Sequence, residues 1–258
     1  MLRKRIIFTL IYAKGCFNQS RNFRLQKVGN IDWLEKNYKL KEISYSLDEL
    51  IVVNAARDNK EINLFAKELK RIVKSVFIPI TAGGGITTMD DAKLLFNSGA
   101  DKLILNSSLY LRPDLVKDLI KQYGSQSIVA SIDYSKVNGA NIVLIKDGTQ
   151  KIDINIEDYL KYVQKLDIGE IYLNSIEKDG TGFGYDFDTI DKLAHKLKKP
   201  LIIAGGAGNA DHLIQGLQRE TVDAVATANL FNFIADGLVT AREEIINKNL
   251  KLAKWSKK

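Results

Sequence analysis

The chain repeats itself at a fixed distance, and this repeat constrains the fold more than any other feature. The segment Ala82-Gly83-Gly84-Gly85 is matched by Ala204-Gly205-Gly206-Ala207, which lies 122 residues later. Asp101 and Asp223, Tyr12 and Tyr134, and Lys14 and Lys136 are separated by the same distance. Chance similarity of glycine-rich turns would explain the glycines but not one offset at four separate places. We therefore predict that the two halves of the chain are the same structural unit, used twice.

Short apolar, β-branched runs alternate with helical patterns along the chain, which is typical of a parallel sheet covered by helices. Strands are predicted over 5–11, 49–54, 78–82, 102–106, 127–133, 169–175, 200–204 and 223–227. Helices are predicted over 31–44, 61–74, 89–98, 112–123, 156–166, 186–197, 210–219 and 236–248. Asn30 or Asp32 would open the first helix, Thr88 the third and Pro113 the fourth.

Eight βα units in 258 residues fit a closed barrel better than an open doubly wound sheet. We expect an α/β protein in which residues 1–258 form a single (β/α)8 TIM-barrel domain of the phosphate-binding type, built from two similar half-barrels. The longest irregular stretch is predicted at about 16–30, after the first strand, on the catalytic face.

The composition excludes several function classes. No apolar run approaches the ~18 residues of a membrane span, so neither a membrane nor a secretory route is expected, and we place the chain in the cytoplasm. The net charge of +7 comes from lysines on helices and at the tail, without interleaved aromatics, which favours a solvated surface over nucleic-acid binding. Cys16 is the single cysteine and lies far in sequence from His195 and His212, so no metal site, cofactor or glutamine-hydrolysing Cys–His dyad is predicted.

Both glycine clusters follow an apolar strand and precede a helix, where backbone N–H groups can close on an anion. In barrels, phosphate typically lies after strands seven and eight. One phosphate site is predicted at Gly205, Gly206, Ala228 and Asn229, and the repeat predicts a second at Gly84, Gly85, Asn106 and Ser107. Each cluster alone could be a tight turn, but the pair suits a long ligand with a phosphate at each end.

Two aspartates are candidates for the reaction itself. Asp133 ends the fifth strand, where barrel enzymes keep an acid or a base, although it could also be a helix cap or an ion-pair partner. Asp179 follows the sixth strand, next to Gly180, and could either bind substrate hydroxyl groups or fix the turn.

Charged residues open four of the predicted strands: Arg5, Glu49, Lys102 and Glu170. Such residues converge at the bottom of a barrel, where two charges of each sign could form a neutral ring. From spacing alone, a stabilising network is the usual interpretation of charges on this face.

Taken together, the motifs resemble those of the cyclase (synthase) subunit of imidazole glycerol phosphate synthase over about residues 1–235. The matching motifs are Met1-Leu2-x-Lys4-Arg5-Ile6-Ile7, Gly83-Gly84-Gly85-Ile86, Gly99-Ala100-Asp101-Lys102, Asp179-Gly180-Thr181 with Gly184-Tyr185-Asp186, and Gly205-Gly206-Ala207-Gly208.

The resemblance implies a role for the charge ring. In that family the bottom charges gate an ammonia tunnel, and a separate glutaminase subunit docks on the N-terminal face of the barrel. All four gate positions match here, at Arg5, Glu49, Lys102 and Glu170. Asp101 and Gln126 match positions near the subunit interface.

The active site departs from the family pattern. The family uses an aspartate at the ends of strands one and five, and the first of these positions is Ile11, which the repeat also pairs with Asp133. An isoleucine cannot transfer a proton, and losing one catalytic carboxylate costs about 10²–10⁴-fold in rate. The first-loop lysine of the family is Gln19 here, and the aspartate that ends strand two is Asn54.

We therefore expect a divergent paralogue from surface-polysaccharide or flagellar-glycan biosynthesis, to which the stretch Ser20–Gly29 is also similar. Such paralogues pair with a glutaminase-like subunit and a separate sugar amidotransferase to form amidino sugars. The small-molecule partner would be phosphorylated or similar to a nucleotide sugar. Two alternatives stay open: a genuine histidine-pathway cyclase (a lyase) and a non-catalytic scaffold that presents ammonia. The full charge ring argues against a third, the related sugar-phosphate isomerase, which needs no ammonia gate.

Overall fold

Parallel strands close into a barrel in the computed structural model, which describes residues 3–38, 40–230, 232–233 and 237–253. Around the barrel the order is β1, β4, β5, β6, β7, β10, β11 and β12, and β12 pairs with β1 to close the ring. The bounds are β1 (Arg5–Ala13), β4 (Glu49–Asn54), β5 (Ile80–Gly83), β6 (Lys102–Leu105), β7 (Ile128–Val137), β10 (Glu170–Ser175), β11 (Leu201–Ala204) and β12 (Ala224–Thr227). The predicted (β/α)8 TIM barrel of the α/β class is confirmed.

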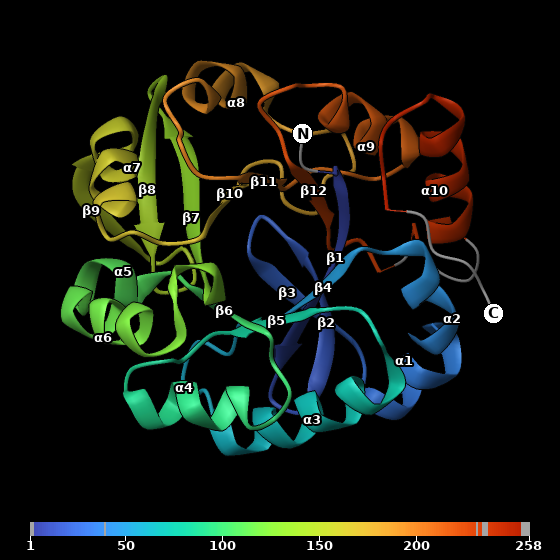
Figure 1. Cartoon of the computed structure of the whole chain (residues 1–258), viewed down its shortest axis with the longest axis horizontal. Coiled ribbons are helices and arrows are strands. Elements are labelled where there is room, and N and C mark those ends of the chain that lie inside the picture. Colours follow the sequence, from blue (N-terminus) through green and yellow to red (C-terminus); the bar gives the residue numbers. More distant parts are fainter. Residues whose placement is uncertain (1–2, 39, 231, 234–236, 254–258) are drawn as a thin grey trace.

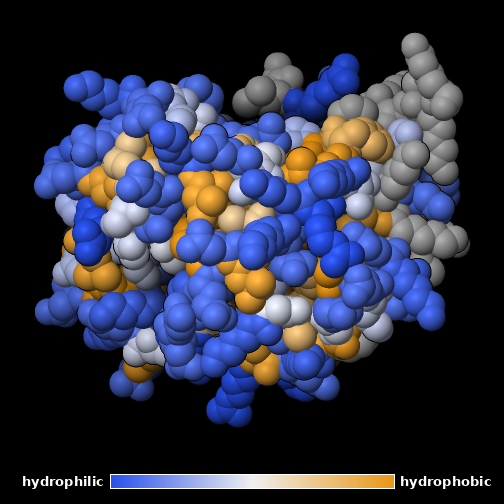
Figure 2. Space-filling model, turned by 90° about the horizontal axis from the view of Figure 1, so that it is seen from below, coloured by the Kyte–Doolittle hydropathy of each residue, from blue (hydrophilic) through white to orange (hydrophobic). Residues whose placement is uncertain are grey.

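Helices form an outer ring around the strands (Figure 1). They are α1 (Ile31–Tyr38), α2 (Leu40–Ile43), α3 (Ile62–Ser75), α4 (Met89–Phe96), α6 (Pro113–Tyr123), α7 (Ile156–Lys165), α8 (Phe187–Ala194), α9 (Ala210–Leu217) and α10 (Gly237–Asn247), with one-turn 3₁₀ segments η1 (Ser44–Ser46) and η2 (Ser125–Ser127). The predicted caps are present: Asn30 accepts from the Trp33 N–H, Thr88 forms a capping box with Asp91, and Pro113 starts α6. The outer face over α3 and α4 is largely hydrophilic, with small apolar groups between the charges (Figure 2).

Two antiparallel hairpins were not predicted. The stretch 16–30, expected to be irregular, forms β2 (Cys16–Arg21) and β3 (Arg24–Gly29), and β2 pairs with the extended end of β1. Asn22 and Phe23 join them with positive φ angles of 50° and 61°, as a two-residue hairpin turn requires. A second hairpin, β8 (Ala140–Ile145) and β9 (Gln150–Asn155), continues from β7, and the short helix α5 (Ser107–Leu111) follows β6.

The two half-barrels correspond in space, but their offset is not constant. The carbonyls of Tyr12 and Tyr134 accept equivalent bonds, from the N–H groups of Ala55 and Ile176, so the offset of 122 holds at the first strand of each half. Within the repeated glycine cluster, the residues with positive φ are Gly84 and Gly85 in one half and Gly205 and Gly206 in the other, which is an offset of 121. The predicted match of Ala82 with Ala204 is therefore wrong by one residue, because the positive φ angles define the turn.

Side chains that point into the barrel form columns with a period of two residues. Along β1 the column is Arg5, Ile7, Thr9 and Ile11. It begins with the charged Arg5, continues with the apolar Ile7, and ends with Thr9 and Ile11, which line the cavity. The columns of β4, β6 and β10 also begin with a charge and continue with Ile51, Ile104 and Tyr172. A separate, larger core fills the space between the strands and the helices. None of the helices in the described ranges is both long and apolar enough to cross a membrane.

Candidate active site

A cavity of about 670 Å³ opens at the carboxyl ends of the barrel strands. Its lining comes from both halves of the chain. It includes Gly180 and every residue of the two predicted phosphate sites: Gly84, Gly85, Asn106, Ser107, Gly205, Gly206, Ala228 and Asn229. Asp133 and Asp179 line it as well. The size is within the range of small-molecule sites.

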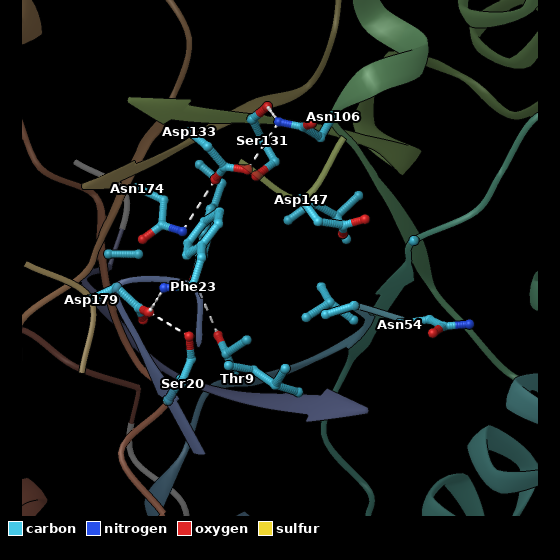
Figure 3. A pocket seen from close by; sticks show the side chains of 18 of the residues that line it. Thr9, Ser20, Phe23, Asn54, Asn106, Ser131, Asp133, Asp147, Asn174 and Asp179 are labelled. Carbon is cyan, nitrogen blue, oxygen red and sulfur yellow. Dashed lines mark hydrogen bonds between the residues drawn. The ribbon is translucent and has the colours of Figure 1, made fainter. Parts of the chain in front are cut away.

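Asp133 lies at one wall of the cavity, on β7, and is 7% exposed (Figure 3). Its Oδ2 accepts from the Asn106 amide and its Oδ1 from the Asn174 amide, both at 3.1 Å. Burial raises the pKa of Asp133 to about 7, against the bond from Asn174, which lowers it; the charges of Asp147 and Asp179 raise it further. A carboxyl group with this pKa can give or take a proton near neutral pH, as acid–base catalysis requires.

Ile11 lines the same cavity and carries no group that can exchange a proton. It lies on β1, beside Val53 of β4, in the position that corresponds to Asp133 beside Asn174. The structure therefore places the isoleucine where the repeat predicts a second carboxylate. The neighbouring Asn54 directs its amide away from the cavity (Figure 3), where it donates to the Lys60 carbonyl and accepts from the Ala56 N–H.

Gln19 makes a structural contact at the rim of the cavity. Its Oε1 accepts from the backbone N–H of Leu230 at 2.8 Å, and this ties the β2–β3 hairpin to the end of β12. Gln19 is thus a positional link between two segments of the cavity rim.

The predicted phosphate site at Gly84 and Gly85 has the backbone that such a site needs. Gly84 and Gly85 have φ angles of 93° and 89°, and a Cβ on Gly84 would lie 2.1 Å from the Asn54 carbonyl oxygen. The side chains are less free than predicted: the Asn106 amide donates to Asp133 and to the Ser131 carbonyl, and Ser107 Oγ accepts from the Lys146 N–H. Asn106 therefore orients the carboxyl group.

The predicted phosphate site at Gly205 and Gly206 repeats this arrangement. Gly205 and Gly206 have φ angles of 87° and 112°, and a Cβ on Gly206 would lie 2.0 Å from the Gly184 carbonyl oxygen. Ala228 and Asn229 follow β12, and the Asn229 N–H donates to Thr227 Oγ1 at 3.3 Å. Both ends of the cavity therefore carry a glycine turn that larger residues could not adopt.

Asp179 fixes a loop instead of pointing free into the cavity. Its Oδ2 accepts from Ser20 Oγ at 2.5 Å and from the Phe23 N–H at 3.0 Å (Figure 3). Its carbonyl accepts from the Asn22 N–H. Burial raises the pKa of Asp179, and the bonds from Ser20 and Phe23 lower it. Gly180 allows the close approach, since a Cβ there would lie 1.9 Å from the Ser20 carbonyl oxygen. Of the two predicted roles, the observed bonds fit the fixing of the turn.

The four predicted gate residues meet at the bottom of the barrel. Arg5 contacts Glu49 and Glu170 at 3.0 Å each, and Lys102 contacts the same two at 3.1 Å and 3.0 Å. Thr81 adds a bond to Glu49 Oε1 at 2.5 Å. The side chains are 3–22% exposed, so the ring is closed and mostly shielded from solvent.

The predicted interface residues lie near this end. Asp101 is exposed, but its Oδ2 accepts from the Ile80 N–H at 2.8 Å, and Asp223 accepts from Leu201 in the same way at 2.9 Å. Gln126 is exposed on η2 and donates to the Tyr123 carbonyl. Asp101 thus has a structural contact, shared by its repeat partner, in addition to any role in an interface.

Some cavity residues were not predicted: Asn174, which donates to Asp133, Tyr172, whose hydroxyl lies 3.4 Å from Thr9 Oγ1, and the ion pair of Lys60 with Asp147. The column spacing could have indicated Asn174 and Tyr172, which follow Glu170 at intervals of two. Within the described ranges, no group of three or more His, Cys, Asp or Glu side chains is arranged to hold a metal ion.

Known proteins are similar to this chain over nearly its whole length. Residues 27–234 match the family described as "Histidine biosynthesis protein". A protein of Parasynechococcus marenigrum named "Putative imidazole glycerol phosphate synthase subunit hisF2" is 43% identical over 99% of this chain and 95% of its own length. "Imidazole glycerol phosphate synthase subunit HisF" of Chlorobium limicola and that of Chlorobaculum parvum are each 32% identical over 97% of this chain and 98% of their own lengths.

Proposed function

This chain belongs to the histidine biosynthesis protein family, among the HisF-like cyclase subunits of imidazole glycerol phosphate synthase, and we propose that it is the ammonia-using barrel of a two-chain glutamine amidotransferase. Ammonia would come from a separate glutaminase subunit docked on the N-terminal face, near Asp101 and Gln126. Asp133 would be the acid and base, and the two glycine turns would hold phosphate groups.

The observation that carries this proposal is the order of side chains along the barrel axis. A neutral ring of two cations and two carboxylates closes the bottom. Apolar residues, including Ile7, Ile51 and Ile104, follow inside the barrel, and the cavity with Asp133 lies beyond them. A neutral molecule such as ammonia can cross an apolar interior, whereas an ion would have to be desolvated at a large cost.

The comparisons favour the histidine-pathway nucleotide as the acceptor of ammonia. The relatives carry the name of that synthase over nearly the full length of both chains. This supports the cyclase alternative better than the amidino-sugar reaction that the sequence led us to expect.

One residue favours the amidino-sugar acceptor as a second candidate. Ile11 lines the cavity at the position where the cyclase reaction requires a second carboxylate. An isoleucine side chain has no group that can donate or accept a proton. An acceptor whose reaction needs one acid–base group would fit Asp133 alone. A separate sugar amidotransferase would then supply the acceptor.

The deciding experiment measures whether the purified chain, with ammonium at high pH, turns over the histidine-pathway nucleotide, which is the ribulosyl aminoimidazole carboxamide nucleotide. A genuine cyclase gives steady product formation that Asp133→Asn abolishes, by about 10²-fold or more. If wild type gives no product, the cyclase candidate fails and the amidino-sugar precursors become the substrates to assay.

The matched variant is Ile11→Asp, which restores the carboxylate that the repeat predicts. A gain of cyclase product in Ile11→Asp over an inactive wild type would mean that the rest of the old site persists. If Asp133→Asn leaves every ammonia-dependent product unchanged, the barrel is not catalytic and the scaffold alternative holds.

A further inference from the structure

The mouth of the cavity carries an ion pair that the proposed reaction does not use. Lys60, between β4 and α3, lies 2.8 Å from both carboxylate oxygens of Asp147, in the turn between β8 and β9. The two side chains are 24% and 26% exposed, and both residues line the cavity. The pair therefore joins segments from the two half-barrels at the cavity wall.

The ion pair lies at the Gly84–Gly85 end of the cavity. A Cβ on Gly85 would come within 2.8 Å of the Lys60 Cβ, and Lys60 Nζ also donates to the carbonyl of Asn54 at 3.0 Å. On the other side of this end, the backbone N–H of Lys146, beside Asp147, donates to Ser107 Oγ at 2.9 Å. The lysine stem is thus packed against the glycine turn, and the β8–β9 turn is anchored to the same predicted phosphate site.

An ammonium group in this position needs an anion, and a carboxylate meets that need when no ligand is bound. A phosphate group carries more negative charge and more acceptor oxygens than a carboxylate, so it competes well for the three N–H donors of a lysine. The packed stem limits the movement required to a rotation of the outer methylenes.

We propose that Lys60 binds the phosphate group at the Gly84–Gly85 end of the cavity, and that Asp147 is the internal anion that the phosphate displaces. The inference rests on the proposed function, because it assumes that this end takes a phosphate. It adds a specificity element: a doubly charged end group displaces Asp147, whereas a neutral sugar hydroxyl does not. The substrate must therefore enter with a phosphorylated end at Gly85.

The test is a titration of the full chain with inorganic phosphate, followed through the backbone amide signals of Gly85 and Gly206 by NMR. These two signals report the two ends of the cavity separately. Lys60→Met should weaken phosphate binding at Gly85 by about tenfold, which is the cost of one charge-assisted bond. Asp147→Asn should tighten it by about threefold or more, because the internal competitor is gone. Binding at Gly206 should not change in either variant, and the spectra report whether each variant is folded.

Weaker phosphate binding in Lys60→Met and tighter binding in Asp147→Asn, both seen only at the Gly85 signal, support the proposed displacement of Asp147 by phosphate. If wild type binds phosphate at Gly85 and the affinity stays the same in both variants, Lys60 and Asp147 form a structural link and the inference is overturned, while the proposed phosphate site stands. If phosphate binds at neither end in wild type, both the inference and the proposed phosphate sites are overturned. Lys178→Met is the matched control, because Lys178 packs against Gly206 as Lys60 packs against Gly85. A Cβ on Gly206 would lie 3.2 Å from the Lys178 Cβ.

Discussion

At Asp133, burial and hydrogen bonding act on the carboxyl group in opposite directions. Loss of solvent raises its pKa to about 7, and the Asn174 amide, which stabilises the ionised form, keeps the pKa from rising further. Both oxygens already accept an amide bond, so the group is oriented as well as tuned. A single carboxyl group can therefore serve as base and then as acid near neutral pH.

Replacing Asn174 tests this balance. Asn174→Ala removes a hydrogen bond that favours the carboxylate, so the pKa of Asp133 should rise above its wild-type value of about 7 by roughly one unit. The measurement is a ¹³C NMR titration of the Asp133 carboxyl carbon, which avoids the titration of ammonia itself. A pKa that falls in this variant, or a wild-type value below 5, would contradict the account.

Asp101 can have two roles, a stabilising contact within the barrel and a contact with a partner subunit, and a single substitution distinguishes them. If its bond to the Ile80 N–H stabilises the barrel, Asp101→Ala should lower the free energy of unfolding by about 1–2 kcal/mol. Asp223→Ala should do the same, because it removes the equivalent bond to Leu201. Chemical denaturation measures both. Should Asp101→Ala leave stability unchanged while Asp223→Ala lowers it, Asp101 would act through a partner surface alone.

Among the elements, the β2–β3 hairpin shapes the cavity without belonging to the barrel. Asp179 holds it through Ser20 and the Phe23 N–H, and Gln19 ties it to the end of β12. These contacts bring Ser20 and Phe23 to the cavity wall, where Ser20 lies on the other side from Asp133 (Figure 3). The loop after the first strand is therefore an ordered wall of the site.

Loss of the Asp179 carboxylate should release this hairpin. In Asp179→Ala, amide hydrogen exchange of residues 16–29 should speed up by about tenfold or more, since two bonds to one buried carboxylate are lost. Exchange in β4 and β10 should stay at the wild-type rate. Ser20→Ala, which leaves the Phe23 bond intact, is the milder control. Equal exchange in Asp179→Ala and wild type would mean that the remaining contacts, those of Gln19 and Asn22 among them, suffice to hold the hairpin.

The barrel strands could be predicted to within about two residues, except that β7 continues past the predicted end at 133 to Val137. The hairpins could not be predicted, for physical reasons. Both faces of these strands are buried, with Ile51 and Ile202 inside the barrel and Leu50 and Ile203 against the helices, so the strands are apolar runs in the sequence. In β3 the residues are mostly exposed and polar, and the alternation that marks a strand is missing. Its structure depends on pairing with β2, and β2 in turn pairs with the overhanging end of β1, which is a tertiary contact.

The site was predictable to the extent that the repeat and the family motifs carry it. Asp133, both glycine turns and the four ring charges lie where the sequence indicated. Asn106 was predicted as a phosphate ligand, yet its amide is bonded to Asp133, because the strand order brings β6 beside β7. Lys60 and Asp147 are 87 residues apart, so only the closed barrel shows that they meet.

At the scale of the whole molecule, charged and apolar side chains lie at different levels along the barrel axis. The ring of Arg5, Glu49, Lys102 and Glu170 is neutral and closed, and the apolar residues above it offer no partner to an ion. Such a ring can hold the bottom of the barrel together and also select what passes. The two roles predict different results when one cation is removed.

Lys102→Met takes one positive charge from the ring and leaves it with a net charge of −1. The free energy of unfolding should fall by about 1–3 kcal/mol, less than for a fully buried pair because the ring side chains keep some exposure. Lys117→Met, which breaks an exposed ion pair with Asp114, should change stability by less than about 1 kcal/mol.

The same variant distinguishes a gate from a structural ring through its effect on turnover. A negatively charged ring attracts the ammonium ion, which cannot enter the apolar interior, so transfer of ammonia from a glutaminase on the bottom face should become inefficient. Turnover supported by glutamine and the partner subunit should fall by about tenfold. Turnover supported by ammonium in solution, which reaches the cavity from its open mouth, should stay within about twofold of wild type. If both rates fall together, in proportion to the loss of folded protein, the ring stabilises the barrel and does not gate ammonia.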